Sequence, residues 1–256
     1  MIANGSSSEV LPWPLHQRFL KRALDLAVSS VALALGGPLL LLIGGAIKLT
    51  SSGPILFLQE RVGRGGRRFR IWKFRTMVDR ASSLGPAVTA SGDPRVTPLG
   101  RWLRRSKLDE VPQLVNVWLG DMSLVGPRPE VPRYVQTYGA EDRSVLTMRP
   151  GITDLASILF RDEESVLARF PDRDRAYVEV LLPRKLALGR KYLRQQSFTG
   201  DIALLLRTLQ VVLRPRRRHR AVGGLAATPV ADVPLIELPS AETPPVPTGV
   251  QSDLRG

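Results

Sequence analysis

The stretch "LAVSSVALALGGPLLLLIGGAI", residues 26–47, decides the fold of this chain. It runs for 22 residues without a charged side chain. About 20 consecutive apolar residues are enough to cross the hydrocarbon core of a bilayer, and the apolar run of a cleaved signal peptide is shorter. The alternative is a buried core helix, but such a helix normally keeps a polar face. The sequence therefore predicts a helix that inserts into a membrane.

A proline and the flanking charges define two topologies for this segment. Gly37 and Pro38 lie at its centre, where the proline removes a backbone donor and predicts a kink or a break in the helix. A re-entrant helix-break-helix over residues 18–50 puts both basic flanks on the cytoplasmic side, whereas a straight span puts only one flank there. We favour the re-entrant form and keep the straight span as the alternative. The basic flanks are Arg18, Lys21 and Arg22 before the run, and Lys48, Arg61, Arg64, Arg67, Arg68 and Arg70 after it.

The composition narrows the chemistry that the chain can carry out. It contains no cysteine, which excludes disulfides, thiol catalysis and thiolate metal sites. Its two histidines, His16 and His219, argue against a Ser-His-Asp triad and against a histidine-rich zinc site. The net charge of +14 predicts an anionic partner, which is nucleic acid, anionic lipid or a nucleotide substrate.

Residues 51–215 have the pattern of a cytoplasmic α/β domain that is mainly helical. The segment "GPILFLQERVGRGGRRFRIWKFRTM", 53–77, predicts a short β-hairpin with its turn at 63–66. Residues 201–213 predict an amphipathic helix, capped by Asp201, that either packs on the core or lies on the membrane surface. Further helices are predicted at 99–105, from 109 to about 119, at 134–146 and at 162–196 with interruptions at Pro171 and Pro183, and a loop is predicted at 120–132.

The two ends of the chain lack such a pattern. Residues 1–17 are expected to be a flexible lead-in. Residues 216–256 are first basic and then rich in proline, with little hydrophobic periodicity, so we expect them to be disordered.

Asp109 and Glu110 are adjacent acids in a strongly basic chain. Pro112 is tolerated only in the first turn of a helix, so a helix is predicted to begin near Asp109. There the acids can simply cap the helix. The same position also keeps a carboxylate ionised, attracts phosphate and suits a divalent metal, and an aspartate can attack phosphorus. Cations that can hold phosphate oxygens, each of which can also be a plain surface charge, are Lys73, Arg75, Arg104 and Arg128.

A series of longer motifs contains these residues. They are "KRALD" (21–25), "GP" (37–38), the hairpin segment (53–77), "DPRVTPLGRWLRRSKLDEVPQL" (93–114), "GDMSLVGPRPE" (120–130) and "RPGIT" (149–153). In this order they resemble the bacterial sugar transferase family, the monotopic phosphoglycosyl transferases, over roughly residues 18–215. Several motifs of five or more residues in one order are far more specific than a lone short pattern.

The resemblance implies a reaction and a place for it. A sugar 1-phosphate moves from a nucleoside-diphosphate sugar, usually a UDP-sugar, to polyprenyl phosphate such as undecaprenyl phosphate, and UMP is released. It implies a monotopic protein of the bacterial cytoplasmic membrane with a re-entrant helix, membrane lipids around it and the catalytic domain on the cytoplasmic face. The product begins the assembly of exopolysaccharide, O-antigen or capsule.

The resemblance also implies roles for individual residues. Asp109 is the nucleophile that forms a phosphosugar-enzyme intermediate, and Glu110 assists with metal or proton handling. Mg²⁺ is the expected cofactor, with Asp109 and Glu110 as ligands. The positions that match basic or nucleotide-binding residues of the family are Lys73, Arg75, Arg104, Pro127, Arg128, Pro129 and Arg149.

Two departures and two alternatives accompany this interpretation. Gly37 stands where many members have serine, and "RPGITD" replaces "RPGITG" in a region thought to sort sugars. A nucleic-acid-binding protein would explain the charge, but the uncharged run and the lack of a recognisable binding module argue against nucleic acid. A membrane-bound interaction scaffold without catalysis is the second alternative. The sequence leaves the oligomeric state open, and a homo-oligomer is compatible with it.

Overall fold

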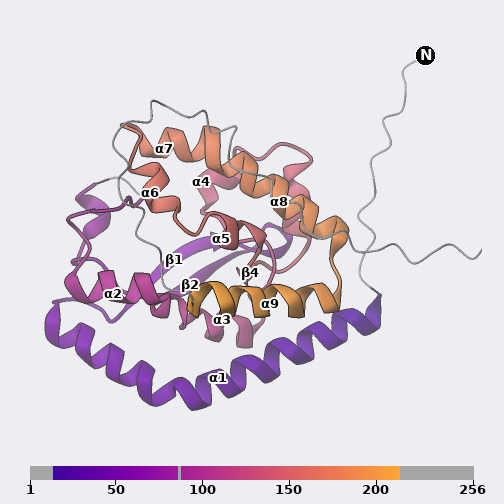
Figure 1. Cartoon of the computed structure of the whole chain (residues 1–256), viewed down its shortest axis with the longest axis horizontal. Coiled ribbons are helices and arrows are strands. Elements are labelled where there is room, and N and C mark those ends of the chain that lie inside the picture. Colours follow the sequence, from indigo (N-terminus) through magenta and orange to yellow (C-terminus); the bar gives the residue numbers. More distant parts are fainter. Residues whose placement is uncertain (1–13, 86–87, 214–256) are drawn as a thin grey trace, which may run out of the picture. The chain divides into compact units, whose positions relative to one another are not determined.

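The structure, a computed structural model, describes residues 14–85 and 88–213 and begins with one long helix, α1 (Leu15–Thr50). The helix continues through Gly37 and Pro38, so of the predicted kink or break the break is wrong. Figure 1 shows a bend near the middle of α1 instead. A proline inside a helix removes one hydrogen bond and displaces the preceding turn, which bends the helix, while the bonds on either side keep it helical.

The surface of α1 is apolar and exposed. By length and composition this helix can cross a membrane, yet only 11% of its most apolar window is buried inside the protein. A core helix of a water-soluble domain would have most of that window covered. The exposed apolar side chains of the central and C-terminal parts include Val31, Leu35, Leu39, Leu41 and Leu42.

The C-terminal third of α1 packs against the rest of the protein through apolar contacts. Ile43 and Ile47 form a buried cluster with Phe74 and Leu103. Gly44 lies so close to Ile55 that a Cβ there would be 3.3 Å from a methyl carbon of Ile55. This end of the helix is therefore fixed to the elements that follow it.

The N-terminal third of α1 is held by polar contacts. The Oδ1 atom of Asp25 accepts hydrogen bonds from the backbone N–H of Leu124 at 2.9 Å and from the hydroxyl of Ser123 at 3.1 Å. Lys21 donates to the carbonyl of Val125 at 2.9 Å. Because Asp25 is buried, losing these bonds would leave polar groups without partners, which is costly.

Two further residues complete this attachment. Arg22 donates to the carbonyl oxygens of Val117 at 2.7 Å and Trp118 at 2.9 Å. Asp201 was predicted to cap its helix, but it lies inside the first turn of α9 and is buried. Its carboxylate pairs with Lys21 and accepts a hydrogen bond from the hydroxyl of Tyr192 at 2.6 Å. Both ends of α1 are thus bound to the same folded unit.

The predicted hairpin is confirmed. Strands β1 (Leu56–Val62) and β2 (Arg68–Phe74) pair antiparallel, with Leu56 opposite Phe74. The turn between them, Arg64–Gly66, contains Gly65 and Gly66 with φ of 66° and 78°, a region that favours glycine. Figure 1 shows this hairpin above α3 and α1, with its C-terminal strand leading toward α2.

A second pair of strands was not predicted. Strand β3 (Ser123–Val125) lies within the predicted loop and pairs in parallel with β4 (Gly151–Thr153). Each strand has only three residues, which is too short for a periodic hydrophobic signal. The backbones approach so closely that a Cβ on Gly151 would lie 2.1 Å from the amide nitrogen of Gly126.

The remaining helices are mostly shorter than predicted. The helix predicted at 99–105 is confirmed as α2, but residues 134–146 form only a short helix and a separate 3-10 turn. Residues 162–196 divide because Pro171 lies between two helices, whereas Pro183 is accommodated in the first turn of the last one. The bounds are α2 Pro98–Ser106, α3 Gln113–Leu119, α4 Pro132–Val135, 3-10 turn Asp142–Thr147, α5 Leu155–Leu159, α6 Glu163–Leu167, α7 Arg173–Ala176, π-turn Tyr177–Leu181, α8 Leu182–Gln195 and α9 Phe198–Leu213.

The apolar residues of α9 divide between the core and the surface. Leu204 and Leu205 pack against a buried cluster that includes Val117, Met122 and Tyr192. In contrast, Leu206, Leu209, Val212 and Leu213 are exposed. Helix α9 therefore offers one apolar side to the core and another to the surroundings.

The predicted boundaries of the two terminal segments can be compared with the structure. Helix α1 begins at Leu15, so residues 15–17 are helical rather than part of the lead-in. Residues 1–13 and the predicted tail at 216–256 lie outside the described residues.

Replacing Asp25 by alanine should destabilise the protein by about 2 kcal/mol, because two donors at the start of β3 lose their acceptor. Chemical denaturation in detergent micelles measures this change. The control is Ser30→Ala on the exposed side of α1, which should change stability by less than about 0.5 kcal/mol. Equal stability of the Asp25→Ala variant and the wild type would contradict the proposed attachment.

Candidate active site

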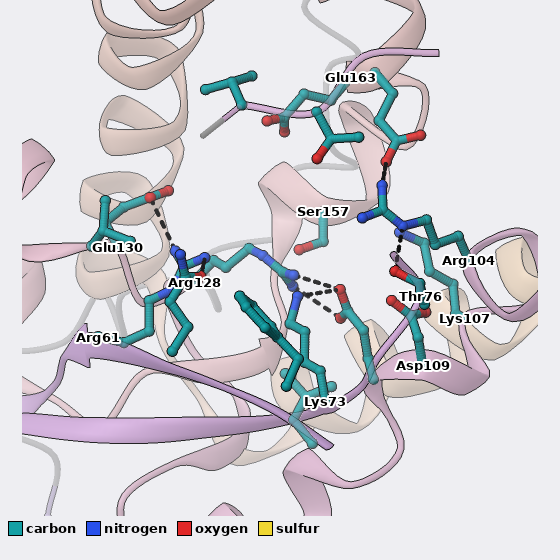
Figure 2. Close-up of a pocket in the computed structure, with 18 of the residues that line it drawn as sticks. Arg61, Lys73, Thr76, Arg104, Lys107, Asp109, Arg128, Glu130, Ser157 and Glu163 are labelled. Atoms are coloured by element: carbon teal, nitrogen blue, oxygen red, sulfur yellow. Dashed lines mark hydrogen bonds and ion pairs between the residues drawn. The ribbon is translucent and has the colours of Figure 1, made fainter. Parts of the chain in front are cut away.

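A cavity of about 1050 Å³ contains most of the predicted site residues. Figure 2 shows Asp109 beside Thr76, Arg104 and Lys107, with Lys73 and Arg128 further along and Arg61 and Glu130 at the far side. Its walls come from β2, the end of α2, the segment before α3, the loop after β3, and α5. The fold therefore brings together residues that are far apart in the sequence.

Asp109 is placed by a sharp turn rather than by a helix start. Helix α2 ends at Ser106, and the next residue, Lys107, adopts φ of 62°, an uncommon value for a residue other than glycine. A 3-10 turn, Leu108–Glu110, follows, and α3 begins only at Gln113, after Pro112. The predicted helix from Asp109 is therefore wrong at its beginning, and the two acids do not cap α3.

The carboxylate of Asp109 has an unusual environment. The side chain is buried, and its Oδ1 atom has no hydrogen-bond partner in the described structure. Burial, together with the neighbouring charge of Glu110, raises the pKa of Asp109 to about 6, against the opposing effect of Lys73. The sequence predicted the opposite effect, in which a helix N-terminus keeps the carboxylate of Asp109 ionised and so lowers its pKa. Asp109 is still mostly ionised at neutral pH, because its pKa stays below 7.

Glu110 has the opposite environment. Arg128 donates two hydrogen bonds to its carboxylate, at 2.5 and 3.1 Å, and Lys73 donates a third at 3.1 Å. Burial alone would raise the pKa of Glu110, but Arg128 and Lys73 hold it well below its usual value. Burial in turn lowers the pKa of Lys73 to about 8. Hydrogen-bonded cations thus balance the charge of Glu110, whereas no such cation is bonded to Oδ1 of Asp109.

The loop that carries Arg128 is fixed by the second pair of strands. The amide of Gly151 donates to the carbonyl of Pro127 at 3.0 Å, and the amide of Arg128 donates to Asp154 at 3.3 Å. Pro127 lines the cavity, and the carbonyl of Pro129 accepts a hydrogen bond from Arg61 at 3.0 Å. The predicted nucleotide-binding loop therefore lies at the cavity.

Arg104 reaches the cavity from α2. Its Nε donates to the hydroxyl of Thr76 at 2.8 Å, and its Nη1 pairs with Glu164 at 2.9 Å. The start of α2 presses directly on Thr76, because a Cβ on Gly100 would lie 2.0 Å from the Thr76 carbonyl oxygen. Glycine at position 100 is thus needed to bring Arg104 and Thr76 together.

Arg75 is a buried cation with unused donors. Its Nη2 donates to the carbonyl of Ser51 at 2.8 Å, just after α1, while Nε and Nη1 have no hydrogen-bond partner in the described structure. The residue also lines the cavity. A guanidinium is always charged, so these donors favour an anion as a ligand.

Arg149 does not belong to this cavity. Its Nε donates to the carbonyl of Gly120 at 2.8 Å, at the end of α3, and its nearest charged neighbours include Arg22 and Arg64. The prediction that Arg149 binds the nucleotide is therefore not supported by its position. The resemblance of the motif "RPGIT" to the family placed Arg149 in the site. In the structure, Thr153 at the end of β4 and Asp154 before α5 line the cavity, and Arg149 does not.

A second polar group at the far side of the cavity was not predicted. Glu130 is buried, pairs with Arg61 at 3.4 Å and accepts a hydrogen bond from the hydroxyl of Tyr177. Lys185 lies 4.0 Å from Glu130 and pairs with Glu163 at 2.7 Å. Burial and Glu130 raise the pKa of Tyr177 well above its usual value. Of these residues, only Glu130 belongs to a motif that the sequence analysis identified, because it directly follows "GPRP".

The residues present fit one divalent metal ion at Asp109. Mg²⁺ prefers oxygen ligands and usually binds through one or two carboxylates together with substrate phosphates. The Oδ1 atom of Asp109 is such a ligand without a partner, whereas both oxygens of Glu110 are bonded to cations. Within residues 14–85 and 88–213, no group of three or more acids or histidines forms a fuller metal site.

A buried aspartate beside a cation-lined cavity, on a domain attached to an apolar helix, defines a membrane-associated site for anionic substrates. Comparison with known proteins gives the family: the model for bacterial sugar transferases matches residues 16–215, and the chain belongs to that family.

Relatives of this chain carry informative names. It is 35% identical over 207 residues to the UDP-N-acetylgalactosamine-undecaprenyl-phosphate N-acetylgalactosaminephosphotransferase of Aeromonas hydrophila, covering 80% of this chain and 46% of that protein. It is 40% identical over 198 residues to the UDP-glucose:undecaprenyl-phosphate glucose-1-phosphate transferase of Caulobacter vibrioides, covering 75% and 69%. It is 32% identical over 211 residues to the exopolysaccharide production protein ExoY of Rhizobium meliloti, covering 77% and 86%. The chain thus spans about half of the Aeromonas protein and most of ExoY.

Replacing Arg128 by methionine should destabilise the protein by roughly 2 kcal/mol, because Glu110 loses two charge-assisted hydrogen bonds in a buried position. Thermal or chemical denaturation in detergent measures the change. The matched control is Arg104→Met, whose ion-pair partner Glu164 is about half exposed, so it should cost less than about 1 kcal/mol. Equal losses in the two variants would contradict the assigned role of Arg128.

Proposed function

We propose that this chain transfers a sugar 1-phosphate from a UDP-sugar to a polyprenyl phosphate, such as undecaprenyl phosphate, and releases UMP. The names of the relatives support this class of reaction, in which both the Aeromonas and the Caulobacter proteins act on undecaprenyl phosphate. The observation that carries the proposal is the carboxylate of Asp109, which is buried, mostly ionised and without a hydrogen-bond partner at Oδ1 beside a cavity lined by cations.

The first half of the proposed reaction forms a bond between Asp109 and the sugar phosphate. A carboxylate oxygen of Asp109 attacks the phosphorus that carries the sugar, and the bond from this phosphorus to the bridging oxygen breaks. The bridging oxygen leaves with its electron pair as part of UMP. A carboxylate that made its full set of hydrogen bonds would be a weaker nucleophile, which is the difference between Asp109 and Glu110.

The second half returns Asp109 to its starting state. A phosphate oxygen of the polyprenyl phosphate attacks the same phosphorus, and the bond to the Asp109 oxygen breaks. The product is a polyprenyl diphosphate sugar. Neither half requires a net proton transfer if both leaving oxygens depart as anions, so cations can replace a general acid.

The cations of the cavity stabilise the phosphate oxygens in this scheme. Arg75 supplies Nε and Nη1, which have no partner in the described structure, and Lys107 and Arg104 lie beside Asp109. Arg128 and Lys73 keep Glu110 ionised and add positive charge near the cavity centre. Fixed donors that meet developing charge without rearrangement are an effective source of catalysis.

Mg²⁺ is the proposed cofactor, with Asp109 as its protein ligand. When bound, the ion supplies positive charge that offsets the charge of the diphosphate. Glu110 contributes through its effect on Arg128 and Lys73, because both of its oxygens are committed to these cations.

The membrane topology that we propose is re-entrant, with both ends of α1 on the cytoplasmic face of the bacterial cytoplasmic membrane. A straight helix of 36 residues would be about 54 Å long, more than the ~30 Å hydrocarbon core. Yet Lys21 and Asp25 near one end and Ile47 near the other bind the same folded unit. A straight span would separate these two ends by the bilayer.

The exposed apolar residues of the other helices support the same placement. Trp102 on α2, Trp118 and Leu119 on α3, and Leu206 and Leu209 on α9 are exposed. Tryptophan is enriched at membrane interfaces, and an amphipathic helix can lie in that plane. We propose that these helices rest on the membrane surface, so that a lipid-linked acceptor reaches Asp109 without leaving the bilayer. The relative ExoY is named an exopolysaccharide production protein, which supports a role in exopolysaccharide assembly. We propose that the chain acts at the start of exopolysaccharide, O-antigen or capsule assembly.

Replacing Asp109 by asparagine should lower turnover at least about a thousandfold, because the amide cannot attack phosphorus. The assay follows UMP release by purified protein with a UDP-sugar, Mg²⁺ and undecaprenyl phosphate. The matched control is Asp121→Asn, an exposed carboxylate outside the cavity that should leave turnover within about twofold. Normal turnover by the Asp109→Asn variant would rule out the proposed mechanism.

Single cysteines at the two ends of α1 should show the same accessibility. The chain contains no cysteine of its own, so His16→Cys and Ser52→Cys can each be labelled alone. A membrane-impermeant maleimide should miss both positions in intact cells and label both in inverted membrane vesicles. Opposite accessibility of the two positions would show a straight span and contradict the re-entrant topology.

A further inference from the structure

We propose that Arg18, Arg22, Arg64 and Arg149, here called the arginine cluster, bind the phosphate group of an anionic phospholipid from the surrounding bilayer. The cluster lies outside the catalytic cavity, since none of its members lines that cavity. The proposal rests on the proposed membrane attachment of α1. It assigns a binding site to Arg149, which the resemblance alone had placed in the active site.

The cluster is built at the C-terminal end of α3. Arg22 donates to the carbonyls of Val117 and Trp118, and Arg149 donates to the carbonyl of Gly120. The two guanidinium groups lie on either side of the same glycine, because a Cβ on Gly120 would be 3.4 Å from Nη2 of Arg22 and 4.0 Å from Nη2 of Arg149. The carbonyl oxygens at the end of α3 therefore hold two like charges near each other.

The charge of the cluster is not balanced by the protein. Burial lowers the pKa of Arg149, and Arg22, Arg64 and Arg18 lower it further, while Asp25 acts in the opposite direction. The Oδ1 atom of Asp25 is already bonded to Ser123 and Leu124. Within residues 14–85 and 88–213, no member of the cluster forms an ion pair with a carboxylate. A phosphate group would supply the missing negative charge and accept hydrogen bonds from two guanidinium groups.

The neighbourhood of the cluster fits a lipid rather than another phosphate carrier. Phe19 follows Arg18 and is 73% exposed, and Trp118 and Leu119, at the end of α3, are 51% and 57% exposed. A phospholipid places acyl chains directly beside its phosphate, so it can cover these apolar side chains while its head group meets the arginines. A nucleic acid or a free phosphate has no apolar part to do so.

A bound lipid would also strengthen the contact between α1 and α3. Arg22 comes from α1 and Arg149 from the segment before β4, so one phosphate between them would connect two parts of the chain. Without it, the carbonyls of α3 and the charge of Asp25 oppose the repulsion between Arg22 and Arg149.

The test is lipid binding to the full chain, measured by native mass spectrometry in detergent with added phosphatidylglycerol or phosphatidylcholine. We expect the first phosphatidylglycerol to bind at least about tenfold more tightly than the first phosphatidylcholine. Arg64→Gln, which removes an exposed arginine without a carbonyl contact, should weaken the first phosphatidylglycerol about fivefold, equivalent to about 1 kcal/mol. The matched control is Arg67→Gln in the same hairpin turn, which should change this affinity less than about twofold.

Three results of the binding experiment would overturn the proposal. Equal affinity for the two lipids would show that the phosphate charge is not recognised. Equal losses in Arg64→Gln and Arg67→Gln would show a diffuse attraction in place of a defined site. Displacement of phosphatidylglycerol by inorganic phosphate at about 10 mM would assign the cluster to a free anion. Membrane attachment is measured separately, by sedimentation of the wild-type protein with phosphatidylcholine vesicles. If the protein does not sediment with the vesicles, both this proposal and the membrane placement of α1 are wrong. If it sediments but binds the two lipids with equal affinity, only the lipid site is wrong.

Discussion

The hydrogen bonds that Asp25 accepts from the start of β3 connect α1 to the site. Ser123 and Leu124, which donate these bonds, are followed within a few residues by the loop that holds Arg128. One turn earlier in α1, Arg22 binds the last carbonyls of α3, the helix that follows Asp109 and Glu110. One short segment of α1 therefore binds next to two of the chain segments that line the cavity, the one before α3 and the one after β3. Since the opposite end of α1 packs on Phe74 and Leu103, the helix bends and keeps both ends on one unit.

The chemistry depends on an unequal distribution of charge between two adjacent acids. Glu110 receives three hydrogen bonds from Arg128 and Lys73, and so it stays ionised and fixed. Asp109 lies one residue earlier, is equally sheltered from water and has an oxygen without a partner. The sharp turn at Lys107 produces this difference, because it points the two side chains to different surroundings. A buried carboxylate without compensation is unfavourable for stability, and a phosphate substrate with its metal ion would offset that cost.

Much of this organisation could be predicted from the sequence because it depends on local patterns. The uncharged run predicted α1, and the alternating and turn residues predicted the hairpin. The order of the motifs predicted that Lys73, Arg104, Asp109 and Arg128 lie in one site. The errors concern interactions between distant segments. Pro112 suggested a helix from Asp109, but packing against α2 inserts a 3-10 turn first. Asp201 was predicted to be a helix cap, but its partner is Lys21, which lies 180 residues earlier in the sequence. The pairing of β3 with β4, which turns Arg149 away from the cavity, rests on two strands too short to recognise.

The central claim is that the oxygen of Asp109 forms a covalent bond to the sugar phosphate. The direct measurement incubates the purified full chain with a UDP-sugar and Mg²⁺ in the absence of a lipid acceptor, followed by intact and peptide mass spectrometry. We predict a mass increase equal to one sugar phosphate, located on the peptide that contains "KLDEVPQL" and on Asp109 within it. The addition of undecaprenyl phosphate should remove it. Turnover without any adduct, or an adduct on another residue that is equally abundant in the Asp109→Asn variant, would contradict the mechanism.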